Sequence, residues 1–367
     1  MPIEFPGPEE PHPPLGRTRH PYFMHEMVRR QSVAGRATYR ATCESLGTNA
    51  EPPPSGQLLA MGLGTSFHAA LAAGHALRPV LEGRADVRVR TSFDLLEEAA
   101  PPPARSTALV FTASGETALT NAALGWLKAR GTRTVVVSAR ETSTAAAAAD
   151  RLLLTQYADE TSWTHTVSFT AALVAIGVLA EHWAHPGTEL PAVEDDIADA
   201  FTAAIATENS VVELVDRFAD RDRYILSGAG YGEAAAREGA LKLREAAGRF
   251  CAAVGTEEFL HGVIPSANDK TAVIAVATSP AQRTRAEQGL RAVSLVGAKT
   301  LLLDVSGGAP GDGVLTVPPA PRPIPTALAV VPLQLLAYWT ATAEGRNPDV
   351  MGLDDVRYLA ARRTFGI

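Results

Sequence analysis

The chain has 367 residues, of which 46% are hydrophobic and 20% are charged, and this composition is typical of a folded protein with two domains. The formal net charge of −7 and the scattered basic residues argue against a nucleic-acid-binding surface. The two cysteines, Cys43 and Cys251, provide neither a disulfide framework nor the Cys/His spacing of a metal site.

Residues 1–21 are acidic and rich in proline, and they lack the basic start and apolar core of a signal peptide. Their composition predicts a tail without fixed structure. The longest apolar stretch, residues 167–183, is about one turn short of a bilayer span and contains Ser168 and Glu181. We therefore expect a buried helix there, no membrane partner and a cytoplasmic protein.

Short apolar runs that end at turn residues alternate with helix-like segments in the first half of the chain. The runs cover residues 57–66, 107–116, 133–139 and 150–155. This alternation predicts βαβ units and a parallel sheet.

The second half repeats the pattern after a break at residues 184–194. An Ala-rich amphipathic stretch over 195–219 predicts a helix, and "RYILSGAGYGEAAAREGALKLRE" then repeats the strand, glycine turn and helix of "QLLAMGLGTSFHAALAAGHAL". Further apolar runs follow at 271–278, 298–305 and 314–318 before a final helix. The sequence therefore predicts two similar α/β halves, each of ordinary domain size.

The glycine turns at 62–64 and 228–232 fall at the carboxyl ends of predicted strands, where open α/β sheets bind ligands. The text "GAGYGE" is not a complete G-x-G-x-x-G motif, and no acidic residue follows the next strand at the spacing that a ribose requires. We therefore expect no dinucleotide.

The segment "FTASGETALT" (111–120) places the hydroxyls of Thr112, Ser114 and Thr117 where a strand becomes a helix. One interpretation is a phosphate site, because a helix start offers unpaired N–H groups and short hydroxyl side chains add donors. The other is ordinary N-capping, with Glu116 in the first turn of the helix. These residues alone leave both open.

A predicted helix over 237–250 carries Glu238, Lys242 and Glu245 on one face. This face is either solvated and held by Glu–Lys pairing, or it meets a ligand at the preceding glycine turn. His261 follows Glu245 by sixteen residues, before a glycine in a predicted loop. It is either a surface residue or, near a phosphate site, an acid/base partner of the glutamate.

Together, "GLGTSFHA" (62–69), "TASGETALT" (112–120), "EGALKLRE" (238–245) and "EEFLHG" (257–262) resemble the double sugar-isomerase (SIS) domain family. The similarity is to the isomerase half of glucosamine-6-phosphate synthase and to the SIS-type amino-sugar-phosphate deaminases and deglycases. The segment "HPYFMHEMVRRQ" (20–31) also resembles the helix that opens this module.

The resemblance implies an α/β fold of two SIS domains, each a doubly wound parallel sheet flanked by helices. It places the domains at 22–190 and 191–345, after the proline-rich tail at 1–21. A C-terminal tail at 346–367 would contribute to the active site.

The resemblance also implies roles for individual residues. Phosphate-contacting turns would be formed by Gly64, Thr65, Ser66, Thr112, Ser114 and Thr117. Glu245 matches the base that moves a proton between C1 and C2 of the open-chain sugar, with Glu238 and Lys242 in support. His261 matches the residue that assists ring opening in the neighbouring subunit's site, which implies a homodimer with a shared site. Such chemistry demands no metal and no organic cofactor.

Three departures from the synthase pattern favour deamination or deglycation over synthesis. Position 2 is proline, so the N-terminal nucleophilic cysteine of the glutamine-hydrolysing domain is absent. No lysine follows Lys299, although the synthase tail supplies a Schiff-base lysine, and Val167 stands where the synthase has another lysine. The ending "NPD…VRYL" is more similar to the galactosamine-6-phosphate deaminase branch.

We therefore expect an amino-sugar-phosphate deaminase/isomerase that converts a 2-amino-2-deoxy-hexose 6-phosphate to a ketohexose 6-phosphate and ammonia. Two alternatives within this chemistry are a fructosamine-6-phosphate deglycase and an isomerase of an unusual amino sugar phosphate. A third is a non-catalytic sugar-phosphate-binding regulatory module. Trp163 and His165 are candidates for contacting the sugar, or they are packing residues of their loop.

Overall fold

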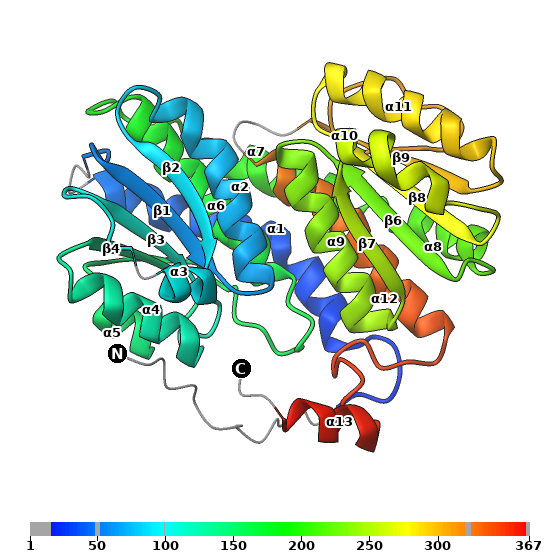
Figure 1. Cartoon of the computed structure of the whole chain (residues 1–367), viewed down its shortest axis with the longest axis horizontal. Helices are drawn as coiled ribbons and strands as arrows, with labels where there is room; N and C mark the ends of the chain where they lie inside the picture. Colours follow the sequence, from blue (N-terminus) through cyan, green and yellow to red (C-terminus); the bar gives the residue numbers. More distant parts are fainter. Residues whose placement is uncertain (1–15, 48–51, 99, 320–323, 365–367) are drawn as a thin grey trace.

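The computed structural model describes residues 16–47, 52–98, 100–319 and 324–364, and it contains two five-stranded parallel sheets (Figure 1). Most of the predicted tail at 1–21 lies outside the described residues. The order in the first sheet is β2-β1-β3-β4-β5, and in the second β10-β9-β8-β6-β7. Both orders reverse direction within the sheet, so the predicted pair of doubly wound α/β domains is confirmed.

The first half contains these strands: β1 (Gln57–Gly62), β2 (Asp86–Thr91), β3 (Thr107–Phe111), β4 (Arg133–Ser138) and β5 (Arg151–Leu154). Its helices are α1 (Phe23–Gly47), α2 (Thr65–Val80), α3 (Ser92–Glu98), α4 (Ala118–Lys128), α5 (Thr144–Ala148) and α6 (Val167–Ala184).

The second half contains these strands: β6 (Arg223–Gly228), β7 (Phe250–Gly255), β8 (Thr271–Ala277), β9 (Lys299–Asp304) and β10 (Val314–Thr316). Its helices are α7 (Glu194–Ile205), α8 (Glu208–Phe218), α9 (Tyr231–Ala247), α10 (Thr256–Glu258), α11 (Pro280–Ser294), α12 (Pro325–Ala343) and α13 (Val356–Arg362). A π-helical turn at Phe259–Val263 and a 3-10 turn at Ile264–Ser266 follow α10.

The central helices α2, α6, α9 and α12 lie between the two sheets and bury the main core (Figure 1). Alternate residues of each strand point to opposite faces, so β1 sends Leu58 and Ala60 into this core and Leu59 and Met61 toward α3 and α4. On the second sheet, α11 covers the outer face. This layering brings the starts of α2 and α9 into the interior between the halves.

Two helices, α6 and α12, are apolar and long enough to cross a membrane, but 89% and 83% of their most apolar windows are buried inside the protein. A helix that is apolar on every side belongs in a core of this kind. The buried helix predicted at 167–183 is thus confirmed.

The helix predicted over 195–219 is wrong in detail, because it is two helices, α7 and α8. Between them the Thr207 hydroxyl donates to the Ala204 carbonyl at 2.7 Å, which diverts that carbonyl from continued helix pairing. Two strands were also missed, β2 and β7. Both lie at sheet edges, where a strand has one unpaired side and its sequence carries a weaker apolar signal.

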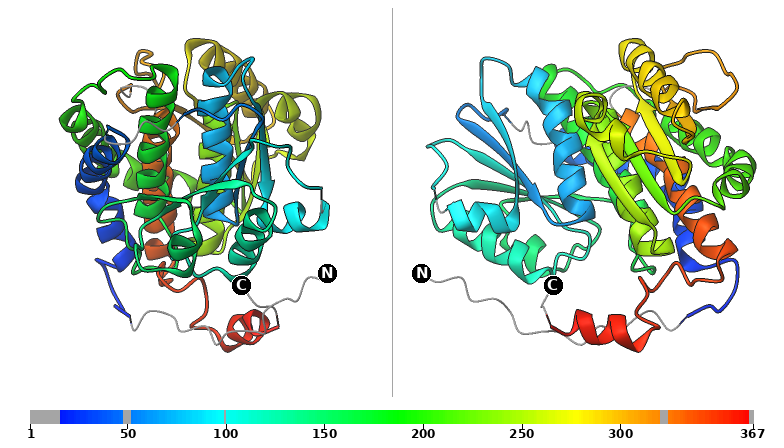
Figure 2. Two further views of the ribbon diagram at one scale, coloured as in Figure 1. Left: turned by 90° about the vertical axis from the view of Figure 1, so that its left-hand side faces the viewer. Right: turned by 45° about the vertical axis from the view of Figure 1, so that its right-hand side comes forward.

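The start of α1 is closed by a residue from the other end of the described chain. The buried carboxylate of Asp349 accepts hydrogen bonds from the backbone N–H groups of Phe23 at 2.9 Å and Met24 at 2.7 Å. Beyond this point α13 stands apart from the two sheets, with none of its residues buried (Figure 2).

Replacing Asp349 with alanine should lower the free energy of unfolding by about 1–3 kcal/mol, because two N–H groups of α1 lose their acceptor. Chemical denaturation checks this, with the exposed Asp354→Ala as the matched control. An equal loss in both variants would show that the carboxylate does not hold α1.

Candidate active site

The turns that open α2 and α9 have the same backbone geometry. Gly64 and Gly230 precede these helices with φ values of 54° and 53°, in a region that residues with a side chain rarely adopt. The two turns therefore confirm at the backbone level the internal repeat seen in the sequence. Each delivers the first turn of its helix to the space between the halves.

Hydroxyl groups gather beyond the carboxyl ends of β1, β3 and β4. One small pocket is lined by the polar residues Thr65, Ser66, Thr112, Ser138, Thr155 and Ser168. Three of the predicted phosphate-contacting residues, Thr65, Ser66 and Thr112, are thus brought together in one pocket. Their role as phosphate ligands remains a prediction.

The β3–α4 turn is not a conventional capping box. Thr117 occupies the N-cap position of α4, but its side chain makes no capping hydrogen bond. The Glu116 carboxylate instead accepts from the backbone N–H and the hydroxyl of Thr144, at 2.9 and 2.6 Å. Thr112 and Ser114 accept from the backbone N–H groups of Gly115 and Glu116. These bonds fold the turn and leave the start of α4 without a side-chain cap.

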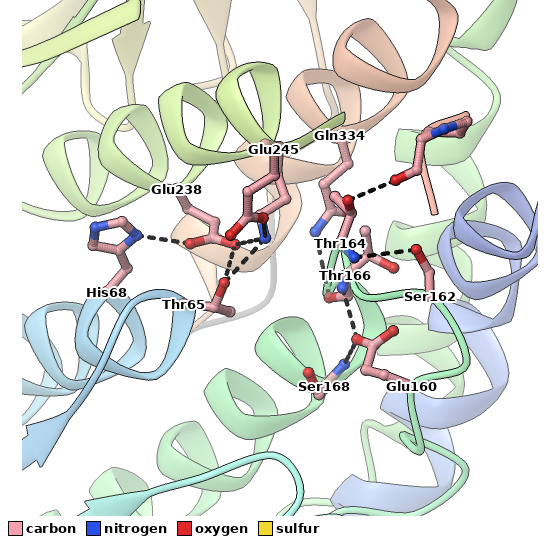
Figure 3. Close-up of polar contacts among 12 residues, drawn as sticks. Thr65, His68, Glu160, Ser162, Thr164, Thr166, Ser168, Glu238, Glu245 and Gln334 are labelled. Carbon is pink, nitrogen blue, oxygen red and sulfur yellow. Dashed lines mark hydrogen bonds and ion pairs between the residues drawn. The ribbon is translucent and has the colours of Figure 1, made fainter. Parts of the chain in front are cut away.

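The polar face of α9 is buried against the first half (Figure 3). The side chains of Glu238 and Lys242 are fully buried, whereas that of Glu245 is 15% exposed. Lys242 Nζ lies 2.5 Å from Glu245 Oε2, 3.3 Å from Glu238 Oε1 and 3.0 Å from Thr65 Oγ1. The interpretation of this face as solvated is therefore wrong.

The first half completes the cluster with two residues of α2. The Thr65 hydroxyl lies 3.1 Å from Glu238 Oε1, and His68 Nδ1 lies 2.7 Å from Glu238 Oε2. Sequence reasoning missed His68, although its position one turn after Thr65 in "GLGTSFHA" places both on one face of the helix.

The two carboxylates of the cluster differ in their proton affinity. Burial alone would raise the pKa of Glu238, but the Lys242 ammonium and His68 outweigh it and hold that pKa at about 2. For Glu245, burial dominates and raises the pKa, with Lys242 offsetting it only in part. Burial would lower the pKa of Lys242, yet the two carboxylates raise it. Glu238 is thus a fixed anion, whereas Glu245 binds a proton more readily than an ordinary glutamate, as a residue that exchanges protons requires.

The segment from Glu160 to Ser168 lies on the side of the cluster opposite His68 (Figure 3). The Glu160 carboxylate accepts from the backbone N–H groups of Thr166 and Ser168. Burial lowers the pKa of His165 to about 4, helped by the Lys242 charge, so His165 is neutral at pH 7. The Trp163 ring lies under the guanidinium of Arg362, 5.7 Å from it. Sequence reasoning missed Glu160 and Ser168, which belong to no motif.

His261 lies outside the cluster within a single chain. It sits in the π-helical turn at Phe259–Val263, its side chain is 77% exposed, and its Nε2 lies 3.4 Å from Glu257 Oε2. Its predicted place in a partner's site remains a prediction. Within the described part of the chain, no group of three or more His, Cys, Asp or Glu side chains is arranged to hold a metal ion.

The charged cluster is present in the second of the two repeats, and its counterparts in the first repeat are uncharged. Counting eight, twelve and fifteen residues from Gly230 reaches Glu238, Lys242 and Glu245, and the same steps from Gly64 reach Ala72, Ala76 and Pro79. Ala72 and Ala76 instead line a small apolar pocket with Tyr231, the counterpart of Thr65.

The hydroxyl-rich turn is likewise present once. After β8, the Gln282 side chain accepts from the backbone N–H and hydroxyl of Thr278, and Pro280 supplies no N–H at the start of α11. The second half therefore contributes charges to the site, and the first half contributes hydroxyls.

Comparison with known proteins agrees with this architecture. The SIS domain family model matches residues 54–182 and 217–343. A glutamine–fructose-6-phosphate aminotransferase [isomerizing] of Gloeobacter violaceus is 32% identical over 312 residues, which cover 78% of this chain and 49% of that protein. The chain thus spans about half the length of this relative.

Solved structures show the same fold. The C-terminal domain of glucosamine-fructose-6-phosphate aminotransferase from Francisella tularensis superposes with a TM-score of 0.79 at 20% identity, covering 90% of this chain and 98% of that one. Glucosamine-6-phosphate deaminase from Thermotoga maritima gives 0.73 at 21% identity, covering 89% and 96%. With two matched regions and this shared fold, the chain belongs to the SIS domain family and contains two copies of the domain.

Proposed function

We propose that the chain is an amino-sugar-phosphate deaminase/isomerase, which converts a 2-amino-2-deoxy-hexose 6-phosphate to a ketohexose 6-phosphate and ammonia. The observation that carries this proposal is Glu245, a carboxyl group with a raised pKa that pairs with Lys242, which in turn contacts Thr65 of the hydroxyl-lined pocket. A base with this property can take a proton from one carbon and return it to the next.

The phosphate of the substrate would bind in the first half. Gly64, Thr65 and Ser66 lie at the start of α2, and Thr112, Ser114 and Thr117 lie at the start of α4. They would offer backbone N–H groups and hydroxyls to an anion, except the Thr65 hydroxyl, which already donates to Glu238. The uncapped start of α4 supports this proposal, because its N–H groups have no side-chain acceptor of their own.

The reaction then follows from the position of Glu245. In the open-chain amino-aldose, Glu245 removes the C2 proton and the carbonyl oxygen at C1 gains a proton, which gives an enaminol. Glu245 returns the proton to C1 while one proton of the amino group passes to water, which gives a ketimine at C2. Water adds to the ketimine carbon and ammonia leaves, so the products are a 2-ketose phosphate and ammonia. Lys242 is paired with both carboxylates, and the proposed reaction does not use it to form a Schiff base.

Deamination is favoured over glutamine-dependent synthesis because residues 344–364, the part of the tail that the structure describes, contain no lysine. The described tail carries Arg362 near Trp163 instead, and a guanidinium does not form an imine with a ketose. The fold shared with a glucosamine-6-phosphate deaminase is compatible with this choice.

Glu245→Gln should lower ammonia release from glucosamine 6-phosphate or galactosamine 6-phosphate by about 10²–10⁴-fold, because the base is lost. Thermal stabilisation by these sugar phosphates should persist. Glu233→Gln, on the first turn of α9 and paired with Arg237, is the matched control. If the wild type binds these compounds and fructosamine 6-phosphates without turnover, the chain is a binding module and the proposal is wrong.

Lys242→Met should move the acid limb of the kcat/KM profile to higher pH. The Lys242 charge lowers the pKa of Glu245, so its loss raises that pKa and the deprotonated base forms only at higher pH. The variant should also lose about 3–5 kcal/mol of stability, most of which Glu238→Gln should restore by removing the unpaired charge. The control Lys270→Met removes an exposed lysine and should leave the acid limb of the profile where it is. If the acid limb of Lys242→Met also stays in place, Glu245 is not the base.

We also propose a homodimer in which His261 completes the partner's site. Mixing Glu245→Gln with His261→Asn subunits under exchange conditions should then restore about one quarter of wild-type activity, because half of the dimers are mixed and each has one intact site. Light scattering gives the oligomeric state in parallel. If a dimer shown to contain one subunit of each variant remains inactive, each active site uses His261 of the same subunit and the proposal is wrong.

A further inference from the structure

The side chain of Glu160, the first residue of the loop 160–166, holds the other end of that loop. Glu160 Oε1 accepts from the backbone N–H of Thr166 at 2.6 Å and from that of Ser168 at 2.8 Å. These N–H groups belong to the start of α6, where a helix has donors without internal acceptors. The carboxyl group therefore closes the loop onto the first turn of α6.

The middle of the same loop is tied to the segment after α12. The backbone N–H of Trp163 donates to the Asp349 carbonyl at 2.9 Å, and the Thr164 hydroxyl donates to the Pro348 carbonyl at 2.6 Å. Gln334 of α12 donates to the carbonyl of Thr166 at 3.3 Å. Hydrogen bonds therefore connect the loop both to α12 and to the segment after it.

Two side chains at this closure are relevant to the candidate site. The Ser168 hydroxyl interacts with the Glu160 carboxyl group, and the buried Thr166 Oγ1 has no hydrogen-bond partner within the described residues. Unpartnered buried oxygens are costly, and natural proteins retain few of them. Ser168 also lines the hydroxyl pocket with Thr65 and Thr112, so it connects the closure of the loop to the candidate site.

We propose that Glu160 is a positioning residue, which holds the loop 160–166 as the wall of the site facing α9 and thereby sets the affinity for the sugar part of the ligand. This inference rests on the proposed function. The wall carries the half-buried residues Trp163 and His165, which in this proposal would contact the sugar hydroxyls. The phosphate would bind on the other loops, so its affinity should not depend on Glu160.

The surroundings of Glu160 also predict a pH effect. Burial raises its pKa to about 7, against the two backbone N–H bonds, the Ser168 hydroxyl and the Lys242 charge, which lower it. Lys242 of α9 is the charged group that acts on it, and His165 is the titratable group of its own loop. From α1 and α6, the apolar residues Met27 and Val167 pack around the adjoining Ala158.

The sign of this effect follows from proton binding. Because the pKa in the folded chain lies above the ordinary glutamate value of 4.5, the folded chain retains a proton that the unfolded chain has lost between about pH 4.5 and 7. Its contribution to stability is present below that window and is lost as the pH rises through it. Glutamine at this position cannot titrate, yet its amide oxygen can accept the same two N–H bonds.

The test compares Glu160→Ala, Glu160→Gln and the exposed control Glu213→Gln, with calorimetric Kd values for fructose 6-phosphate, glucosamine 6-phosphate and inorganic phosphate. We expect Glu160→Ala to weaken hexose phosphate binding about tenfold or more, as a displaced wall would, and to leave inorganic phosphate within about twofold. Glu160→Gln should bind like the wild type. Its Tm should fall less between pH 5 and pH 8 than those of the wild type and Glu213→Gln.

Each other outcome overturns the inference. Equal losses in folded Glu160→Ala and Glu160→Gln would mean that the charge itself contacts ligand. Unchanged hexose phosphate binding in Glu160→Ala would mean that the loop does not form the wall. If Glu160→Ala does not fold, Thr164→Val removes the second attachment and must show the same selective loss. A wild type that binds none of the hexose phosphates would instead refute the proposed function.

Discussion

The buried ammonium of Lys242 is the charge on which the candidate site depends. Removing a charge of this kind from water is costly, and the cost is offset only if oxygen atoms surround it. Here Glu238 and Glu245 come from its own helix and Thr65 comes from the other half of the chain. The same contacts therefore satisfy the ammonium, join the halves and separate the proton affinities of two carboxyl groups seven residues apart.

The repeat explains why such a centre can exist. Each half places a helix start against the side of the other half's central helix, so a pseudo-symmetric fold has two equivalent junctions. One junction holds Glu238, Lys242 and Glu245, and the other holds Ala72 and Ala76, which pack near Tyr231. This second junction buries no charged cluster and so avoids the desolvation cost of the first. In the proposed function, one junction supplies the chemistry and the other supplies packing.

The sequence was sufficient to predict both sheets, the repeat and the helix that carries Glu245, because apolar runs and glycine turns are local signals. It could not distinguish a solvated Glu–Lys face from a buried one, since both have the same spacing on α9. Nor could it identify the break at Thr207 or the edge strands β2 and β7, which depend on tertiary contacts and on sheet position. Glu160 and His68 were missed because what they do is defined by partners far away in the sequence.

The attachment of Asp349 to α1 joins residues 326 positions apart. Phe23 and Met24 therefore lack their acceptor until Asp349 has been synthesised, and the loop at Trp163 lacks its partner in the same segment until then. During synthesis on the ribosome, each half can build its sheet from nearby contacts, but the wall beside the carboxylate cluster cannot form early. A nascent chain that stops before this segment would hold both sheets and an unfinished site.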